Sequence, residues 1–305
     1  TLDTDIKSIK KAARKGVEKE LISRVEEILS KKEISINNEN KIIWKKNAIA
    51  RLKKGNDYLN PEIDIINDDS LNNESRSKLI VFLNKWLRNY IDEVLGDLIS
   101  LTKHKITNQY LRGLVFQLYE NNGVIKRNKV DKIVKAIPLE ERKKLWGMGI
   151  KIGRYHIYLP KMLKPKAVNF RVSLWKIFYN LQSNHKIPKS GLNFLNEKGL
   201  ERNFLLLCGF EKFKDFFVRI DILEKLFIKI IENTKNKKFQ INAEMMNLLG
   251  CSKENFYKLM NYMNYHKDKN EDTYFFKGER HKKEKLIKFD KKENPFNKLL
   301  SLNIK

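Results

Sequence analysis

Basic and aromatic side chains are concentrated between Arg142 and Asn196, where together they could hold the phosphate backbone of a nucleic acid. These 55 residues contain twelve Lys and Arg but no Asp or Glu, whereas the overall content of 37 acids in 305 residues would place about seven acids there. Aromatic residues are spread through the same segment. A long acid-free basic segment with planar side chains beside it is typical of a surface that binds nucleic acid.

Eight residues of this segment are predicted to contact the ligand. Pro160 and Pro165 bracket a KMLK turn, which would present Lys161 and Lys164 with little loss of conformational entropy. Such lysines bind sugar-phosphate without reading bases, and a tyrosine can stack on a base. A tyrosine packed on its own hairpin and a histidine with an ordinary structural role are the competing interpretations. The predicted contacts are Lys151, Arg154, Tyr155, His156, Lys161, Lys164, Lys166 and Arg171, with a secondary set of Lys126, Arg127, Lys253 and Lys258.

Motifs for catalysis, nucleotide binding and metal binding are missing from the sequence. No Gly is followed by Lys, so the phosphate loop GxxxxGK[ST] is absent, and there is no DExD or DExH run. The five histidines show no HExxH spacing, and Cys208 and Cys251 form no CxxC pair. The sequence therefore predicts no catalytic residue, no metal and no cofactor in this chain.

The overall composition predicts a folded protein that seeks polyanions. The formal net charge is +26, while a hydrophobic fraction of 41% is enough to bury a core. No stretch approaches eighteen apolar residues and no signal region opens the chain, so we expect a cytoplasmic protein without a membrane partner. Because 50 of the 63 bases are Lys, a lysine-rich surface that serves only solubility is the simplest alternative.

The apolar pattern along the chain predicts a mainly α-helical protein with small β-hairpins. Apolar residues recur at three- to four-residue spacings in most segments, and alternate with polar ones in only a few. The expected organisation is a helical N-terminal extension (1–40), a short β-hairpin with a long packing helix (41–106), a basic winged-helix-like unit (107–200), a second such unit (201–281) and a charged C-terminal tail (282–305).

Two winged-helix-like units are predicted because three short helices followed by a hairpin occur twice. In the first unit a hairpin is expected directly after Gly149, and in the second the segment with Tyr274, Phe275 and Phe276 would form the wing. The helices of the first unit are expected at 108–122, 126–136 and from Pro138 onward. Those of the second unit are expected at 222–230, 243–249 and 252–263.

Several segments together resemble the C-terminal region of alphaproteobacterial helicase-related proteins. These are superfamily II enzymes similar to the DExH RNA helicase of the mitochondrial degradosome. The resemblance covers most of residues 40–302 and is carried by RGLVFQLYENNGVI (112–125), GIKIGRYHIYLPKMLKPKAVNFRVSLW (149–175), FVRIDILEKL (217–226), INAEMMNLLGCSKENFYKLM (241–260) and NPFNKLL (294–300).

The resemblance implies that the chain is the non-motor part of such a helicase. Two RecA-like motor domains, with bound ATP and magnesium, would lie upstream of Thr1 and would be partners in cis. The region would guide single-stranded RNA or DNA leaving the motor, and RNA is favoured over DNA by the resemblance alone. No catalytic residue is carried over, because the family's catalytic motifs match nothing in this chain.

Two other functions compete with a helicase accessory region. In a stand-alone winged-helix regulator of transcription, the helix at 252–263 would read duplex DNA, although it offers Lys253, Asn255 and Lys258 but no Arg. In a protein-interaction platform, Tyr262, Tyr265 and Phe275 would contact a partner and the charge would serve only solubility.

Overall fold

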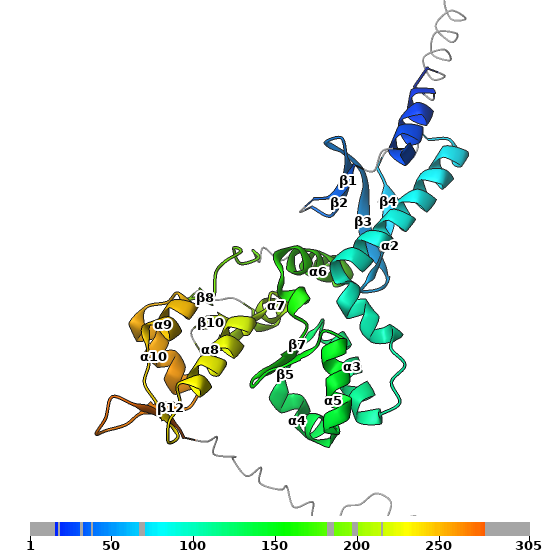
Figure 1. The fold of residues 1–305 in the computed structure, drawn as a ribbon. Coiled ribbons are helices and arrows are strands. Elements are labelled where there is room, and N and C mark those ends of the chain that lie inside the picture. Colours follow the sequence, from blue (N-terminus) through cyan, green and yellow to red (C-terminus); the bar gives the residue numbers. More distant parts are fainter. Residues whose placement is uncertain are drawn as a thin grey trace, which may run out of the picture.

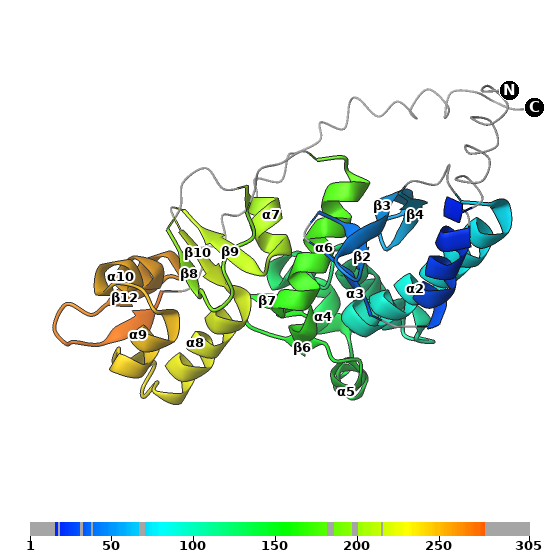
Figure 2. The ribbon, with the colours of Figure 1, turned by 90° about the horizontal axis from the view of Figure 1, so that it is seen from above.

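Helices and four small antiparallel sheets make up the part of the chain that the computed structural model describes. This part comprises residues 16–17, 19–30, 33–37, 39–66, 71–181, 186–196, 201–214 and 216–277. The strands at residues 34–65 lie toward one end of the molecule, and the helices and strand at residues 243–267 lie at the other end (Figures 1 and 2). The predicted helical extension is helical at 19–30, while residues 1–15 and the predicted tail at 282–305 lie outside the described residues.

A four-stranded meander and one long helix form the N-terminal part. The strands are β1 (Ile34–Ile36), β2 (Lys41–Trp44), β3 (Asn47–Asp57) and β4 (Asn60–Ile65), in that order across the sheet. Helix α2 (Asn73–Lys103) is capped by the preceding residue, Asn72, whose side chain accepts a hydrogen bond from the backbone N–H of Ser75. Buried residues at three- to four-residue spacings, such as Leu79 and Leu83, face the core. The predicted helix is confirmed, but the predicted short hairpin is a larger sheet.

Three helices and a small sheet follow, in the order that the sequence predicts for the first unit. The sheet has the strand order β5-β7-β6, so the last strand lies between the other two. Gly123 ends the first helix with a φ of +81°, which other residues rarely adopt. The hairpin predicted after Gly149 is present as β6 and β7. The elements are α3 (Gln109–Glu120), β5 (Val124–Lys126), α4 (Arg127–Ala136), α5 (Leu139–Gly147), β6 (Lys151–Ile152) and β7 (His156–Tyr158).

The next segment has a three-stranded sheet of its own, with the order β8-β10-β9. Its elements are the 3-10 helix η2 (Pro160–Leu163), α6 (Pro165–Phe178), β8 (Phe194–Leu195), α7 (Arg202–Leu207), β9 (Phe210–Phe213) and β10 (Phe216–Arg219). Since β8 pairs with β10, the predicted boundary between residues 200 and 201 is wrong, because it would divide this sheet. A two-residue strand such as β8 has no period that a sequence pattern could show.

The C-terminal described part repeats the element order of the first unit. Gly250 ends α9 in the left-handed conformation, and the Ser252 side chain accepts a hydrogen bond from the backbone N–H of Asn255 at the start of α10. The elements are α8 (Ile220–Glu232), β11 (Lys238–Phe239), α9 (Ala243–Leu249), α10 (Lys253–Tyr262), β12 (Tyr265–Lys267) and β13 (Tyr274–Phe276), with the sheet order β11-β13-β12. No helix in the described ranges is long and apolar enough to cross a membrane.

Candidate nucleic-acid interface

Three of the predicted contact residues are exposed cations without an ion pair to any described residue. Lys151 lies on β6, Arg154 lies in the turn between β6 and β7, and Lys164 directly precedes α6. The Arg154 guanidinium stands 5.9 Å from the ring centre of Phe227 and 5.8 Å from that of Phe276. These cations are available to phosphate groups of a ligand.

Two further lysines are exposed but neutralised by acids of α2. The Lys161 ammonium lies 2.8 Å from Asp97 Oδ1, and that of Lys166 lies 2.6 Å from Glu93 Oε1. The hydrogen bond to Glu93 raises the pKa of Lys166. Exposed pairs of this kind add little stability, so a ligand can break them at small cost. The surface formed by the acid-free segment is therefore less positive than its sequence alone indicates, because acids from α2 lie beside it.

Two predicted contacts are buried, so their side chains do not lie at the surface where the prediction placed them. His156 is 1% exposed and Arg171 is 0% exposed. His156 is the first residue of β7, the middle strand of its sheet, and Arg171 lies on the buried side of α6. Their polar atoms bind other parts of the protein instead.

Tyr155 is half-buried and packs on the protein itself. Its ring lies edge-on to Phe227 at 5.9 Å between ring centres, and its hydroxyl oxygen is buried. Burial also raises the pKa of Tyr155. A ring held in this way is not available to stack on a base, which favours the competing interpretation from the sequence.

The secondary set divides in a similar way. Lys126 pairs with the buried carboxylate of Glu211, and the half-buried guanidinium of Arg127 donates a hydrogen bond to the carbonyl oxygen of Gly153. Lys253 and Lys258 are exposed on α10, where Lys258 pairs with Glu254 at 2.6 Å. Lys253 and Lys258 are therefore exposed, whereas Lys126 and Arg127 are only partly exposed and are held by other parts of the protein.

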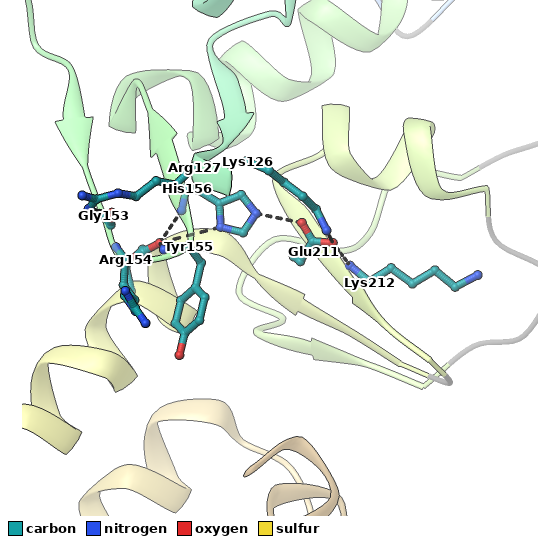
Figure 3. Close-up of polar contacts among 9 residues, drawn as sticks. Lys126, Arg127, Gly153, Arg154, Tyr155, His156, Glu211 and Lys212 are labelled. Carbon is teal, nitrogen blue, oxygen red and sulfur yellow. Dashed lines mark hydrogen bonds and ion pairs between the residues drawn. The ribbon is translucent and has the colours of Figure 1, made fainter. Parts of the chain in front are cut away.

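His156 lies between two carboxylates that come from later parts of the chain. His156 Nε2 is 2.7 Å from Oε2 of Glu211 on β9, and His156 Nδ1 is 3.7 Å from Oε1 of Glu224 on α8 (Figure 3). The second distance is that of an ion pair and is too long for a hydrogen bond. Lys126 lies 2.7 Å from the other oxygen of Glu211. This buried cluster joins the β5-β7-β6 sheet to β9 and α8.

Charge in the cluster is balanced because each ion has an opposite partner. Burial opposes the charge of His156, but the contacts with Glu211 and Glu224 outweigh it and raise the pKa of the imidazole. Burial likewise opposes the charge of Glu211, yet its bonds with His156 and Lys126 lower the pKa of that carboxyl. The cluster is therefore a charged structural joint between the units.

The carboxylate of Glu224 also binds the backbone of the β6–β7 turn. It accepts hydrogen bonds from the backbone N–H groups of Arg154, Tyr155 and His156 at 2.6, 2.9 and 2.8 Å. Gly153 makes this approach possible, since a Cβ atom at that position would clash with the carboxylate. The predicted wing is thus held against α8.

Sequence reasoning missed both carboxylates of this joint. One signal was present for Glu224, which lies four residues after Ile220 on the apolar stripe of α8 and is buried with it. An acid at such a position is unusual and calls for a buried partner. Glu211, in a four-residue strand, gives no comparable signal.

Comparisons with known proteins found no relative of this chain. No protein-family model matches the chain, and no curated protein or solved structure matches it either. Within the described ranges, no group of three or more His, Cys, Asp or Glu side chains could hold a metal ion.

The raised pKa of His156 predicts that stability falls as the pH rises above about 6.5, the ordinary value for histidine. Below that value His156 is protonated in both the folded and the unfolded chain, so its stabilising contribution is complete. Between that value and the higher folded pKa, only the folded chain holds the proton, and the loss is at most about 1.4 kcal/mol per pH unit. Urea unfolding from pH 6 to pH 9 measures the slope.

A variant with His156→Gln is the control for this pH dependence. We expect it to be less stable than the wild type at pH 6 and to show a shallower fall above pH 6.5. Equal slopes in the two proteins would show that His156 does not carry a proton in the folded chain.

Proposed function

We propose that this chain is a nucleic-acid-binding accessory region of an ATP-dependent helicase, and that it guides single-stranded RNA or DNA over a basic surface. The observation that carries the proposal is a set of exposed cations, on a chain with a net charge of +26, that form no ion pair with any residue in the described part of the chain: Lys151, Arg154 and Lys164. Electrostatic attraction to phosphates dominates binding that is independent of sequence.

We further propose that α3–β7 and α8–β13 are winged-helix units. Both follow the order helix, strand, helix, helix, strand, strand, and in both sheets the last strand lies between the first two. The segment from α6 to β10 has the same strand order but one helix fewer, which suits a reduced copy of the unit. Repeated units along one chain give an extended surface on which a strand of several nucleotides can lie.

The helicase part of the proposal rests on the sequence resemblance. The resembling segments include α3, the β6–β7 hairpin with α6, α8, and α9 with α10. ATP and magnesium would belong to motor domains in cis, because this chain offers no phosphate loop.

An exposed apolar face on α5 favours a contact with protein as well. Leu139 is 72% exposed and Trp146 is 70% exposed, and their seven-residue spacing places them on the same face of the helix. In the proposed arrangement, this face would meet the motor domains. A recognition role for α10 is less well supported, because the adjacent β12–β13 turn carries Asp268, Glu271 and Asp272.

Fluorescence anisotropy with labelled single-stranded RNA, single-stranded DNA and duplex DNA of mixed sequence tests the proposal. We expect single strands to bind more tightly than the duplex, and their affinity to fall about 10- to 100-fold between 50 and 200 mM salt, as for about four phosphate contacts. Preference for duplex DNA would favour a regulator of transcription. Absence of binding to all three would overturn the proposal.

A further inference from the structure

A cleft of about 300 Å³ lies where the end of η2 and the start of α6 meet the segment before β8 and the start of α8. Buried or half-buried apolar side chains, including Leu163, Val168 and Phe210, line it. Two exposed lysines also line the cleft, Lys164 on one wall and Lys189 on the other. The cleft therefore combines an apolar interior with a basic mouth.

The charge of the cleft is positive in the folded protein. Its lining holds one acid, Asp221, which binds the guanidinium of Arg219 through two hydrogen bonds of 2.7 and 2.6 Å. Because this pair cancels itself, the net charge of the lining comes from Lys164 and Lys189. Neither lysine has an ion pair within the described ranges, in contrast to Lys161, which pairs with Asp97.

Polar groups of the lining are also available to a ligand. The exposed side chains of Asn169 and Ser190 lie on opposite walls and form no hydrogen bond with any residue that the structure describes. A volume of about 300 Å³ is at the lower end for small-molecule sites and gives room for one nucleotide unit. Apolar surface suits a base or a sugar, and lysines suit a phosphate.

We propose that this cleft holds one nucleotide of a single-stranded nucleic acid, with its phosphate bound by Lys164 and Lys189 and its base or sugar against Leu163, Val168 and Phe210. The inference rests on the proposed function and adds the place at which the strand is held. It also explains why the lysines of the KMLK turn differ, because Lys164 faces the cleft while Lys161 pairs with α2.

Anisotropy titration of the full chain with a fluorescein-labelled ten-nucleotide oligouridylate tests the site. Lys164→Gln should weaken binding about three- to tenfold and reduce the salt slope by about 0.7, the value for one phosphate contact on a single strand. Asn169→Trp fills the cleft without changing the charge and should weaken binding about tenfold, which is within the range of one lost base contact.

Matched variants distinguish the contribution of the cleft to binding from that of the general positive charge of the protein. Lys161→Gln removes the same charge from the same turn and should change affinity less than twofold, while Asn169→Ala tests loss of the amide alone. Ser190→Trp fills the cleft from the opposite wall and guards against misfolding of one variant, which circular dichroism would reveal.

The possible results distinguish the two proposals. If the wild-type chain binds the oligonucleotide but Lys164→Gln, Asn169→Trp and Ser190→Trp bind equally well, the cleft is not the site and the proposed function stands. If Lys161→Gln weakens binding as much as Lys164→Gln, charge alone is responsible and the cleft proposal fails. If the wild type does not bind, both proposals fail.

Discussion

Replacing Arg171 by methionine should lower the free energy of unfolding by about 3–5 kcal/mol. The guanidinium is 0% exposed and donates hydrogen bonds to three backbone carbonyl oxygens, those of Asn122, Met162 and Leu207. A buried acceptor that loses its donor costs about 1–3 kcal/mol. Methionine has a similar length but no donor, so all three carbonyls lose this partner together.

Part of that cost is offset because the variant no longer buries a charge. Burial lowers the pKa of Arg171, which shows that the surroundings oppose the charged form. The three carbonyl dipoles are what make the site tolerable for a cation. Arg171→Lys should therefore be intermediate, since a single ammonium cannot reproduce the planar fork that reaches three oxygens.

Urea unfolding monitored by circular dichroism measures these differences. Arg88→Met is the matched control, because Arg88 is exposed on α2 and its loss should change stability by no more than about 0.5 kcal/mol. A change of less than about 1 kcal/mol in Arg171→Met would show that water or other donors replace the guanidinium.

Arg171 also shows why part of the predicted interface could not be recognised from sequence. Met162 in η2 is nine residues away, but Asn122, just after α3, and Leu207, at the end of α7, are 49 and 36 residues away and meet Arg171 only in the fold. Within a window of sequence, Arg171 counts as one more base in an acid-free segment. The same holds for Lys161, whose partner Asp97 is 64 residues away.

Most helices were predictable because they obey a local rule, although the six-residue helix α7 was not predicted. Apolar residues at three- to four-residue spacings place α2, and Pro165 at the start of α6 fixes its first residue. The strands β8 and β11, of two residues each, obey no such rule, and they are set by pairing with β10 and β13. The middle sheet was therefore missed, and the domain boundary was placed inside it.

For the site, the sequence showed where basic residues are concentrated, but it did not show which of them are exposed in the fold. Lys151, Arg154 and Lys164 are at the surface, whereas His156 and Arg171 are buried. Burial depends on whether carboxylates or carbonyls from other elements can satisfy a polar group. The residue pattern of one segment does not show which groups from other elements will lie beside it.

Loss of the contact between the β6–β7 turn and α8 should also lower the stability of the protein strongly. Glu224→Ala should lower the free energy of unfolding by about 3 kcal/mol, because it leaves three backbone N–H groups without their acceptor and removes a partner of His156. Glu232→Ala, at an exposed position of the same helix, is the control and should cost less than about 1 kcal/mol.

Gly153→Ala should cause a loss of similar size in the wild type but not in a chain that already carries Glu224→Ala. In the wild type the added Cβ atom would displace the Glu224 carboxylate from the three N–H groups. Glu224→Ala removes the three atoms that lie nearest to that Cβ position, and Gly153 is not among the glycines with a positive φ. Alanine then restricts the unfolded chain and should raise stability by about 0.4–1 kcal/mol.

The change of sign of the Gly153→Ala effect between the wild type and the Glu224→Ala background therefore tests the role of the Glu224 carboxylate in holding the turn. A double-mutant cycle in urea should give a coupling energy of about 3.5–4 kcal/mol, which is the loss in the wild type plus the gain in the chain without Glu224. If Gly153→Ala costs the same with and without Glu224, the glycine serves the turn itself and the wing is not held by α8. If the cycle shows the expected coupling, the turn that carries Arg154 is fixed by a residue 70 positions further along the chain.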